Sequence, residues 1–259
     1  PFHSDADGTL LGEGAGVLVL KRLADAEADG DRVYAVLKSI GIASDGRAMG
    51  LLAPRVEGEE LAMRRAYESC GIDPDSIGLV EAHGTATPIG DQTELTALQL
   101  VFGDGDNGQP RRPLGAVKSM IGHSIPAAGA AGLIKTALAV YHRVIPPTLH
   151  ADSPNPALKS TPFYLPPEAR PWIHGADHRR RAAVSAFGFG GINCHAILEE
   201  HGSAGDVAPS DRRRRSLARR WNSEVVVIDG DGPAEVADRC RGVVGFLDGD
   251  PEVELGDLA

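Results

Sequence analysis

The 259-residue sequence lacks the signatures of several protein classes. Its formal net charge is -10, so it offers no overall basic surface, and we expect no nucleic-acid partner. No apolar stretch reaches the length of a membrane span, so we expect no membrane association. The first five residues, Pro-Phe-His-Ser-Asp, are not a signal peptide, and the lack of an initiating Met indicates a fragment or a processed chain.

Cysteine is scarce and scattered. Cys70, Cys194 and Cys240 match neither a zinc spacing nor a disulfide framework, so we predict a reducing, cytoplasmic location and no metal site. Cys194 is followed by His195, which invites a catalytic dyad. Neighbours on a strand point to opposite faces, however, so we do not expect Cys194 to be a nucleophile. The sequence therefore has no obvious nucleophile.

Hydrophobic periodicity predicts an alternating α/β order. With 42% hydrophobic and 24% charged residues, the composition is that of an ordinary globular protein. Apolar runs predict strands at 16–20, 33–40, 77–82, 114–118, 182–186 and 192–199. Helical spacing predicts helices at 58–70, 91–102 and 124–142. Helices between strands imply crossover connections and a covered, mostly parallel sheet.

The C-terminal part differs in composition. We predict a main domain over 1–202 and a linker over 203–221, where six arginines lie between Asp211 and Arg220. Such a run is more typical of a solvated segment than of a binding patch. Beyond it, a strand at 224–229 and a helix at 233–247 are predicted. Residues 222–259 are too few to bury a core, so we interpret them as the incomplete start of a small α/β domain.

Two histidines stand where side chains converge in such a fold. His83 and His123 each follow a predicted strand and precede a predicted helix, and Lys118 lies five residues before His123. In an alternating β/α chain, strand ends meet at a common edge of the sheet. We therefore predict that His83, His123 and Lys118 share a polar pocket.

His123 has a predicted electrostatic state. Ser124 is expected to N-cap the next helix, which places His123 at the positive end of that helix. This position disfavours the imidazolium form, so we expect a neutral ring that donates an N–H. A neutral donor suits a carbonyl oxygen that gains negative charge in a transition state. The alternative is a core histidine bonded to a backbone carbonyl.

Two further segments carry polar groups. Thr85 and Thr87 alternate on an extended segment, and their hydroxyls suit an amide-bearing arm. The alternative, a local hydroxyl–backbone turn, is favoured for two such threonines in isolation. Asp91 is expected to cap the following helix. The glycine-rich turn at 187–191 exposes backbone N–H groups that suit an oxyanion hole, although most such turns are simple hairpins.

Together these motifs resemble the C-terminal half of a β-ketoacyl synthase, of the kind found in type I polyketide synthases. The matching segments run in family order, at 7–8, 12–16, 45–47, 81–87, 118–123, 145–148 and 187–195. Two short segments depart from the common pattern. Ser-Ile-Pro at 124–126 replaces the commoner Leu-Glu-Ala, and Ile-Asn-Cys at 192–194 replaces Thr-Asn-Ala. Neither departure removes a catalytic group, but the first lies beside His123.

The resemblance implies a thiolase-like fold, here its C-terminal half in α/β/α layers, and a decarboxylative Claisen condensation. It implies that His83 and His123 bind the extender thioester oxygen and that Lys118 supports them. It assigns pantetheine binding to Thr85 and Thr87 and half of the oxyanion hole to the backbone N–H of Phe189. The family's nucleophilic cysteine lies upstream of the 7–8 motif. We therefore expect no nucleophile in this chain and no activity of the chain alone.

The resemblance also implies partners. Substrates are expected on the phosphopantetheine of an acyl carrier protein, with no cofactor bound directly to this chain. An acyltransferase domain of the same parent chain and a second ketosynthase in a homodimer are the other expected partners, and 222–259 resembles the start of the ketosynthase–acyltransferase linker. A non-catalytic scaffold or chain-length partner is the alternative, but it has no need of buried polar groups that cost stability. A non-decarboxylative thiolase is weaker, because thiolases use a second cysteine in place of the first histidine.

Overall fold

The chain forms two compact units, Pro1–Ala204 and Gly205–Ala259, which are described separately. The computed structural model describes residues 1–46, 53–105, 111–174, 178–188, 190–202, 228 and 232–249. In the second unit it describes helix α7 (Pro233–Gly249), which matches the helix predicted at 233–247. The arginine run and most of the strand predicted at 224–229 lie outside the described residues. The division into 1–202, 203–221 and 222–259 stays a prediction.

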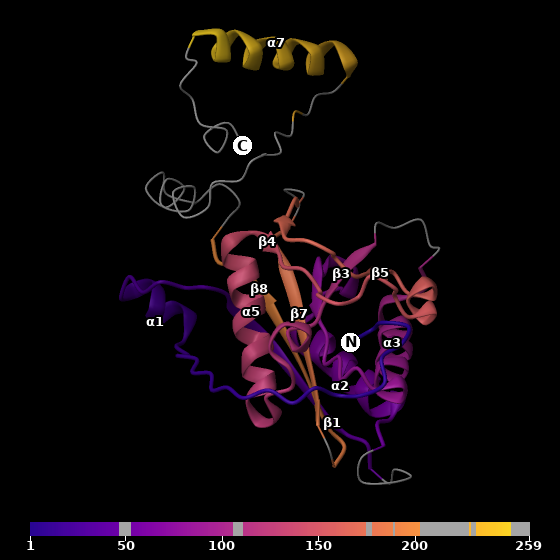
Figure 1. The fold of residues 1–259 in the computed structure, drawn as a ribbon. Coiled ribbons are helices and arrows are strands. Elements are labelled where there is room, and N and C mark those ends of the chain that lie inside the picture. The colour runs from indigo at the N-terminus through magenta and orange to yellow at the C-terminus, as the bar shows by residue number, and fades with distance from the viewer. Residues whose placement is uncertain are drawn as a thin grey trace. The chain divides into compact units, whose positions relative to one another are not determined.

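A six-stranded mixed sheet forms the centre of the first unit (Figure 1). The strand order is β1-β8-β7-β2-β3-β5. The bounds are β1 (Val36–Ser44), β2 (Leu79–Glu81), β3 (Arg112–Gly115), β5 (Phe163–Tyr164), β7 (Arg181–Gly188) and β8 (Ile192–Glu199). Strand β2 runs parallel to β3 and β7, and β3 runs parallel to β5, whereas β8 is antiparallel to β1 and β7. A separate pair joins β4 (Val144–Ile145) to β6 (Arg170–Pro171).

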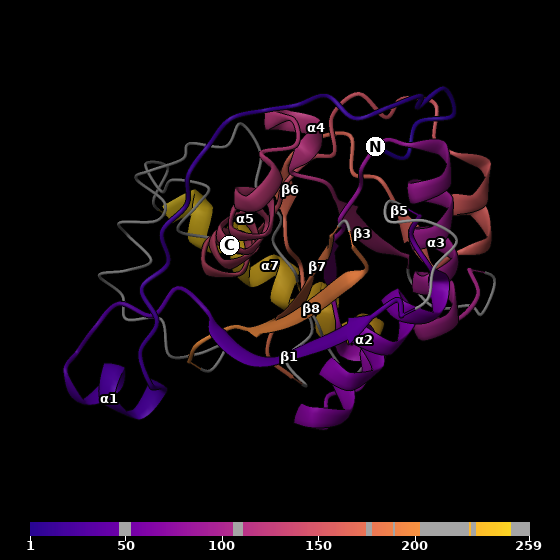
Figure 2. The same ribbon diagram turned by 90° about the horizontal axis from the view of Figure 1, so that it is seen from below.

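Helices cover both faces of this sheet. Figure 2 shows α5 (Ala128–His142) on one side and α2 (Val56–Cys70) with α3 (Pro88–Phe102) on the other. One buried apolar cluster includes residues of α2, α3 and the central strands, and a second joins α5 to the start of β2 and β7. Gly41 permits the close packing of β1 on α2, because a Cβ there would lie 2.0 Å from the Ala62 carbonyl oxygen. The result is the predicted α/β/α layering.

Shorter elements connect the layers. They are α1 (Leu23–Ala28), α4 (Lys118–Ile121) and the 3₁₀ turns η1 (Pro74–Ser76), η2 (Ile125–Ala127) and η3 (Pro156–Ser160). No helix in the described part of the chain combines the length and apolar character needed to cross a bilayer.

The predictions for residues 16–20 and for Ser124 were wrong. Residues 16–20 form no strand, and Val17 and Val19 are 87% and 93% exposed. A strand requires a partner backbone, and none of the described strands pairs with this segment. Ser124 makes no side-chain cap, because a 3₁₀ turn intervenes and α5 begins only at Ala128.

Candidate active site

The fold brings His83 and His123 together, as predicted. Their ring centroids are 5.6 Å apart and the ring planes meet at 84°. His83 follows β2, and His123 follows α4, which comes soon after the parallel neighbour β3. The carboxyl ends of the two strands therefore place both rings at one edge of the sheet. Phe187, near the end of β7, lies beside His83 with ring centroids 5.9 Å apart.

Lys118 completes the predicted group and fixes the tautomer of His83. It is the first residue of α4, and its Nζ lies 3.3 Å from His83 Nδ1. The same ammonium donates to the His83 backbone carbonyl. An ammonium has donors only, so Nδ1 is the acceptor and a neutral ring carries its proton on Nε2.

His123 reaches the same tautomer by a different contact. Its Nδ1 accepts the backbone N–H of Ile125 at 3.0 Å, so the proton of the neutral ring is again on Nε2. Ile125 has a φ of 50°, a strained conformation for a β-branched residue. This strain lies within the segment where the sequence departs from the family pattern. The departure thus leaves the amide that orients His123 in place.

Both imidazoles have lowered pKa values. Burial holds the pKa of His83 well below its usual range, and the positive charge of Lys118 and the neighbouring His123 lower it further. Burial and then Lys118 lower the pKa of His123. The direction agrees with the neutral state predicted for His123. The causes are burial and Lys118, whereas the sequence pattern had pointed to the end of a helix.

Glu94 anchors the His83 loop and is not among the predicted site residues. Its carboxylate accepts the N–H of His83 at 2.7 Å and that of Gly84 at 2.8 Å. Burial raises the pKa of Glu94 to about 7, against the effect of these two N–H donors. An acidic residue beside the apolar stripe of a predicted helix was the available signal, because a buried carboxylate needs partners.

Asp91 does not cap α3, contrary to prediction. The N-cap is Thr87, whose hydroxyl accepts the N–H of Gly90. The buried Asp91 carboxylate instead accepts the backbone N–H groups of Phe2 and Ala86. It therefore holds the loop between β2 and α3 against the start of the chain.

A buried ion pair joins the elements that carry the site. Glu81 contacts Lys135 of α5 at 2.7 Å, and the side chains are 2% and 12% exposed. The other oxygen of Glu81 accepts the N–H of Val117, which precedes α4. This pair links β2, α5 and the segment that carries Lys118. No local pattern in the sequence indicates it, because its members are 54 residues apart.

Thr85 and Thr87 lie close together, but their hydroxyls are not both free. The two Oγ1 atoms are 2.9 Å apart, and that of Thr87 accepts the N–H of Gly90 at 3.1 Å. The local hydroxyl–backbone turn is thus present at Thr87. Gly90 is required here, since a Cβ would lie 2.4 Å from Thr85 Oγ1. Pantetheine binding by these threonines stays a prediction.

The other predicted site elements have different outcomes. Phe189 lies outside the described residues, so its role in an oxyanion hole stays a prediction. The described residues Gly190 and Gly191 lie between β7 and β8, as expected. His195 is buried between Tyr67 Oη and Ser185 Oγ, each at 3.1 Å. Burial raises the pKa of the Cys194 thiol, which makes it less reactive.

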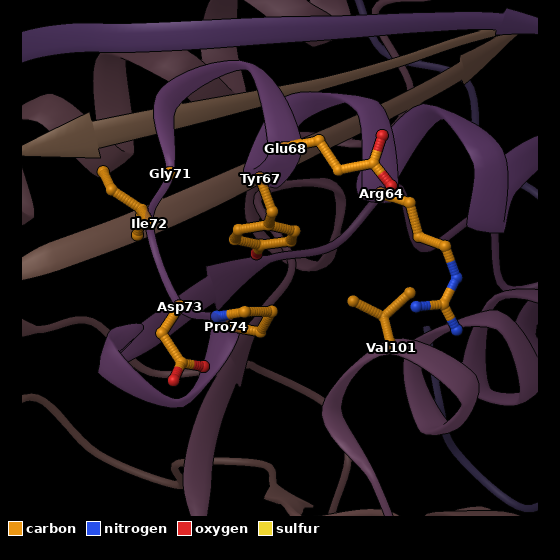
Figure 3. Close-up of a pocket in the computed structure, with 8 residues that line it drawn as sticks. All are labelled: Arg64, Tyr67, Glu68, Gly71, Ile72, Asp73, Pro74 and Val101. Carbon is orange, nitrogen blue, oxygen red and sulfur yellow. The ribbon is translucent and has the colours of Figure 1, made fainter.

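A surface hollow of about 360 Å³ lies at the C-terminal end of α2 (Figure 3). The Tyr67 ring projects from α2 toward Pro74 in this hollow. The full lining is Arg64, Tyr67, Glu68, Gly71, Ile72, Asp73, Pro74 and Val101. None of these is a predicted site residue, so the hollow is separate from the histidine pair.

Comparison with known proteins gives a consistent picture. Residues 34–152 match the family described as "Beta-ketoacyl synthase, C-terminal domain", so the chain contains this domain. It is 44% identical over 247 residues to a polyunsaturated fatty acid synthase of Thraustochytrium sp. (strain ATCC 26185 / S-3), covering 93% of this chain and 8% of that protein. It is 46% identical over 261 residues to a phenolphthiocerol/phthiocerol polyketide synthase of Mycobacterium tuberculosis (strain ATCC 25618 / H37Rv), covering 100% of this chain and 16% of that protein.

Solved structures of ketosynthases also match this chain. The ketosynthase from module 6 of the bacillaene synthase of Bacillus subtilis 168 matches with a TM-score of 0.72 and 35% identity. The match covers 100% of this chain and 43% of that one. The structure titled "PfaC Keto synthase-Chain length factor" matches with a TM-score of 0.71 and 36% identity, over 78% of this chain and 21% of that one. The chain thus spans less than half the length of each of these structures.

Proposed function

Because this chain contains the C-terminal domain of a β-ketoacyl synthase and aligns over its length with polyketide synthase ketosynthases, we propose that its site serves a decarboxylative Claisen condensation. The electrophile is an acyl thioester on a cysteine, and the second substrate is a malonyl-type extender on the phosphopantetheine of a carrier protein. One observation carries the proposal. His83 and His123 are neighbouring neutral imidazoles whose Nδ1 atoms are both occupied, which makes Nε2–H the donor of each ring.

The reaction requires donors for an oxygen that gains charge. The bond between the extender α-carbon and its carboxylate breaks, CO₂ leaves, and the electron pair passes into the thioester as an enolate. The two Nε2–H groups stabilise this enolate oxygen as its charge grows. The α-carbon then attacks the acyl carbonyl carbon, and the cysteine leaves as thiolate. Lys118 keeps His83 in the donating tautomer throughout.

The remaining roles complete the proposal. The Phe189 N–H contributes to an oxyanion hole for the acyl thioester, and Thr85 and Thr87 bind the pantetheine amides. Gly90 packs the two hydroxyls together, and Thr85 retains hydrogen-bonding capacity for an amide because its hydroxyl has a donor and two acceptor sites. An acyl carrier protein, an acyltransferase domain and a second ketosynthase are the proposed partners, with 222–259 beginning the linker to the acyltransferase.

The nucleophile is proposed to come from sequence outside these 259 residues. Cys70 donates to backbone carbonyls within α2, and burial raises the pKa of Cys194. Cys240 is exposed on α7 of the second unit. We therefore expect no condensation by this chain alone. Acylation of Cys194 by an acyl thioester, detected by intact mass, would contradict this.

Exposed apolar residues support the view that the chain functions within a larger protein. Leu10, Val17, Val19 and Leu20 are each more than 70% exposed. A run of this kind marks a surface that another part of the protein covers. We expect the isolated chain to be poorly stable, and a sharp cooperative melt of the isolated monomer would contradict this.

The division of roles has a direct test in the complete gene product. His83→Ala is expected to abolish CO₂ release and condensation with a carrier-bound malonyl group. Acylation of the nucleophilic cysteine, followed by intact mass, is expected to stay largely intact, because it is a separate step. Equal loss of both steps would refute the proposal. Full condensation by the variant would favour a scaffold role for this half.

A further inference from the structure

The segment at 9–12, here called the strap, contacts both the loop that carries His123 and the loop that carries His83 and Thr85. His123 donates its N–H to the Leu10 carbonyl at 2.7 Å, and its own carbonyl accepts the Gly12 N–H at 3.1 Å. Both backbone polar groups of His123 are therefore bound by the strap, and Leu11 forms a parallel bridge with it. A single short segment thus fixes the position of one imidazole.

The same strap reaches the loop that carries the threonines. Thr9 Oγ1 donates to the Thr85 carbonyl at 2.6 Å. Thr85 lies two residues after His83, and the Glu94 carboxylate holds the intervening backbone. Thr9 and Gly12 therefore bind the His83 loop and the His123 loop, respectively. Within the described residues, three strap residues, Thr9, Leu10 and Gly12, make the hydrogen bonds to the two loops.

Close backbone approach explains the glycines in this contact. A Cβ on Gly12 would lie 2.0 Å from the Ile121 carbonyl oxygen, which belongs to the backbone and cannot swing away. On the opposite side, Gly122 has a φ of 71° and a ψ of -174°, a region that essentially only glycine adopts. A Cβ there would lie 3.0 Å from the Leu10 carbonyl oxygen. Gly12 and Gly122 therefore both allow the close approach of the strap to the backbone before His123.

Side-chain burial does not explain why the strap lies here. Leu10 and Leu11 are 79% and 71% exposed in the described structure. The segment is held by main-chain hydrogen bonds and the Thr9 hydroxyl, and these contacts all fall on the two loops of the site. Its geometry is therefore coupled to the positions of His123 and Thr85.

We propose that the strap is a positioning element that sets the placement of His123 and of the Thr85 carbonyl relative to each other. This inference rests on the proposed function, because it assigns the strap to the decarboxylation half of that reaction. Displacing a positioned group by about 1 Å can cost 10²-fold in rate. Changes in the strap should therefore alter the use of the extender and leave acylation of the cysteine unchanged.

The test uses the complete gene product with Thr9→Val, its matched control Thr9→Ser, and Gly12→Ala. Thr9→Val removes the hydroxyl at nearly constant volume, so we expect KM for the malonyl carrier protein to rise about tenfold, with cysteine acylation unchanged. Thr9→Ser keeps the donor and should restore KM to within about twofold. Gly12→Ala should lower the rate of CO₂ release at least about tenfold.

Thermal melts and intact-mass acylation show whether Gly12→Ala is misfolded. If it is, the comparison of Thr9→Val with Thr9→Ser tests the proposal. Thr9→Val kinetics equal to those of wild type, or equal losses in Thr9→Val and Thr9→Ser, would overturn the positioning role. Failure of the proposed function looks different, because the wild-type protein would then release no CO₂ from the malonyl carrier protein.

Discussion

The His83 and His123 loops reach one chemical state by different means. His83 owes its tautomer to a charged side chain, Lys118, and its backbone is held by the Glu94 carboxylate. His123 owes its tautomer to the fixed N–H of Ile125, and its backbone is held by the main chain of the strap. The His83 loop therefore depends on groups that titrate, whereas the His123 loop depends on backbone geometry. Substitutions and pH changes should therefore affect the two loops differently.

Among the substitutions that compare the two loops, Lys118→Met has the largest expected effect. Lys118→Met removes the donor to His83 Nδ1, and we expect a loss of about 10- to 100-fold in activity, the range typical when the hydrogen-bond partner of a metal-binding histidine is removed. The positive charge of Lys118 lowers the pKa of both histidines, so its removal raises both values. Activity requires neutral rings, so the acid limb of kcat/KM should move to higher pH. The pH profile of condensation by the complete protein measures this.

Lys118→Arg is the matched control. It keeps the positive charge, so its acid limb should stay near that of wild type while altered geometry lowers the rate. An acid limb that is unchanged in Lys118→Met would show that Lys118 does not set the protonation state of the imidazoles.

Glycines beside the two histidines give the second comparison. Gly122, before His123, occupies a conformation that only glycine adopts readily, so Gly122→Ala should cost about 1–3 kcal/mol and displace His123. Gly84, after His83, has a φ of 51°, and a Cβ there would meet its nearest neighbour at 3.1 Å. Gly84→Ala should cost about 1 kcal/mol.

Melting temperature and CO₂ release measure both variants. We expect the larger loss of both in Gly122→Ala. The reverse order would mean that the His83 loop is the one that depends on exact backbone geometry.

The predictable parts of this molecule are those with local signals. Apolar periodicity correctly predicted α2, α3 and β8. The rule that parallel strands end at one edge of the sheet correctly predicted that His83, His123 and Lys118 lie together. The strand predicted at 16–20 does not form, because an apolar run alone does not supply a partner strand.

The supporting contacts were not predictable. Thr9 and Thr85 are 76 residues apart, and Glu81 and Lys135 are 54 apart. No spacing rule links residues at such distances, because only tertiary packing decides which backbone segments meet. The residues proposed to carry the chemistry were thus accessible from the sequence, whereas these long-range contacts that support them were not.

The smallest expected effect is on stability through Glu94. Its pKa is raised from 4.5 to about 7, so between these values the folded protein binds more protons than the unfolded chain. The free energy of unfolding should therefore fall as pH rises from 4.5 to 7, through the cost of ionising this buried group. Glu94→Gln cannot ionise and should show a flatter dependence. It should cost at least about 1 kcal/mol, because its amide nitrogen cannot accept one of the two N–H groups that Glu94 binds.

Melts of the complete ketosynthase on either side of this pH window measure the difference. Identical pH dependence in Glu94→Gln and wild type would show that Glu94 does not titrate in this window and that the His83 loop is held by a permanently charged carboxylate.

The proposed chemistry depends most directly on two imidazoles that are neutral and protonated on Nε2. Nitrogen NMR of histidine-labelled complete ketosynthase at neutral pH, assigned with His83→Ala and His123→Ala, reads protonation and tautomer at each ring. The structure predicts Nε2–H and unprotonated Nδ1 for both residues. An imidazolium or an Nδ1–H tautomer at either position would contradict this mechanism.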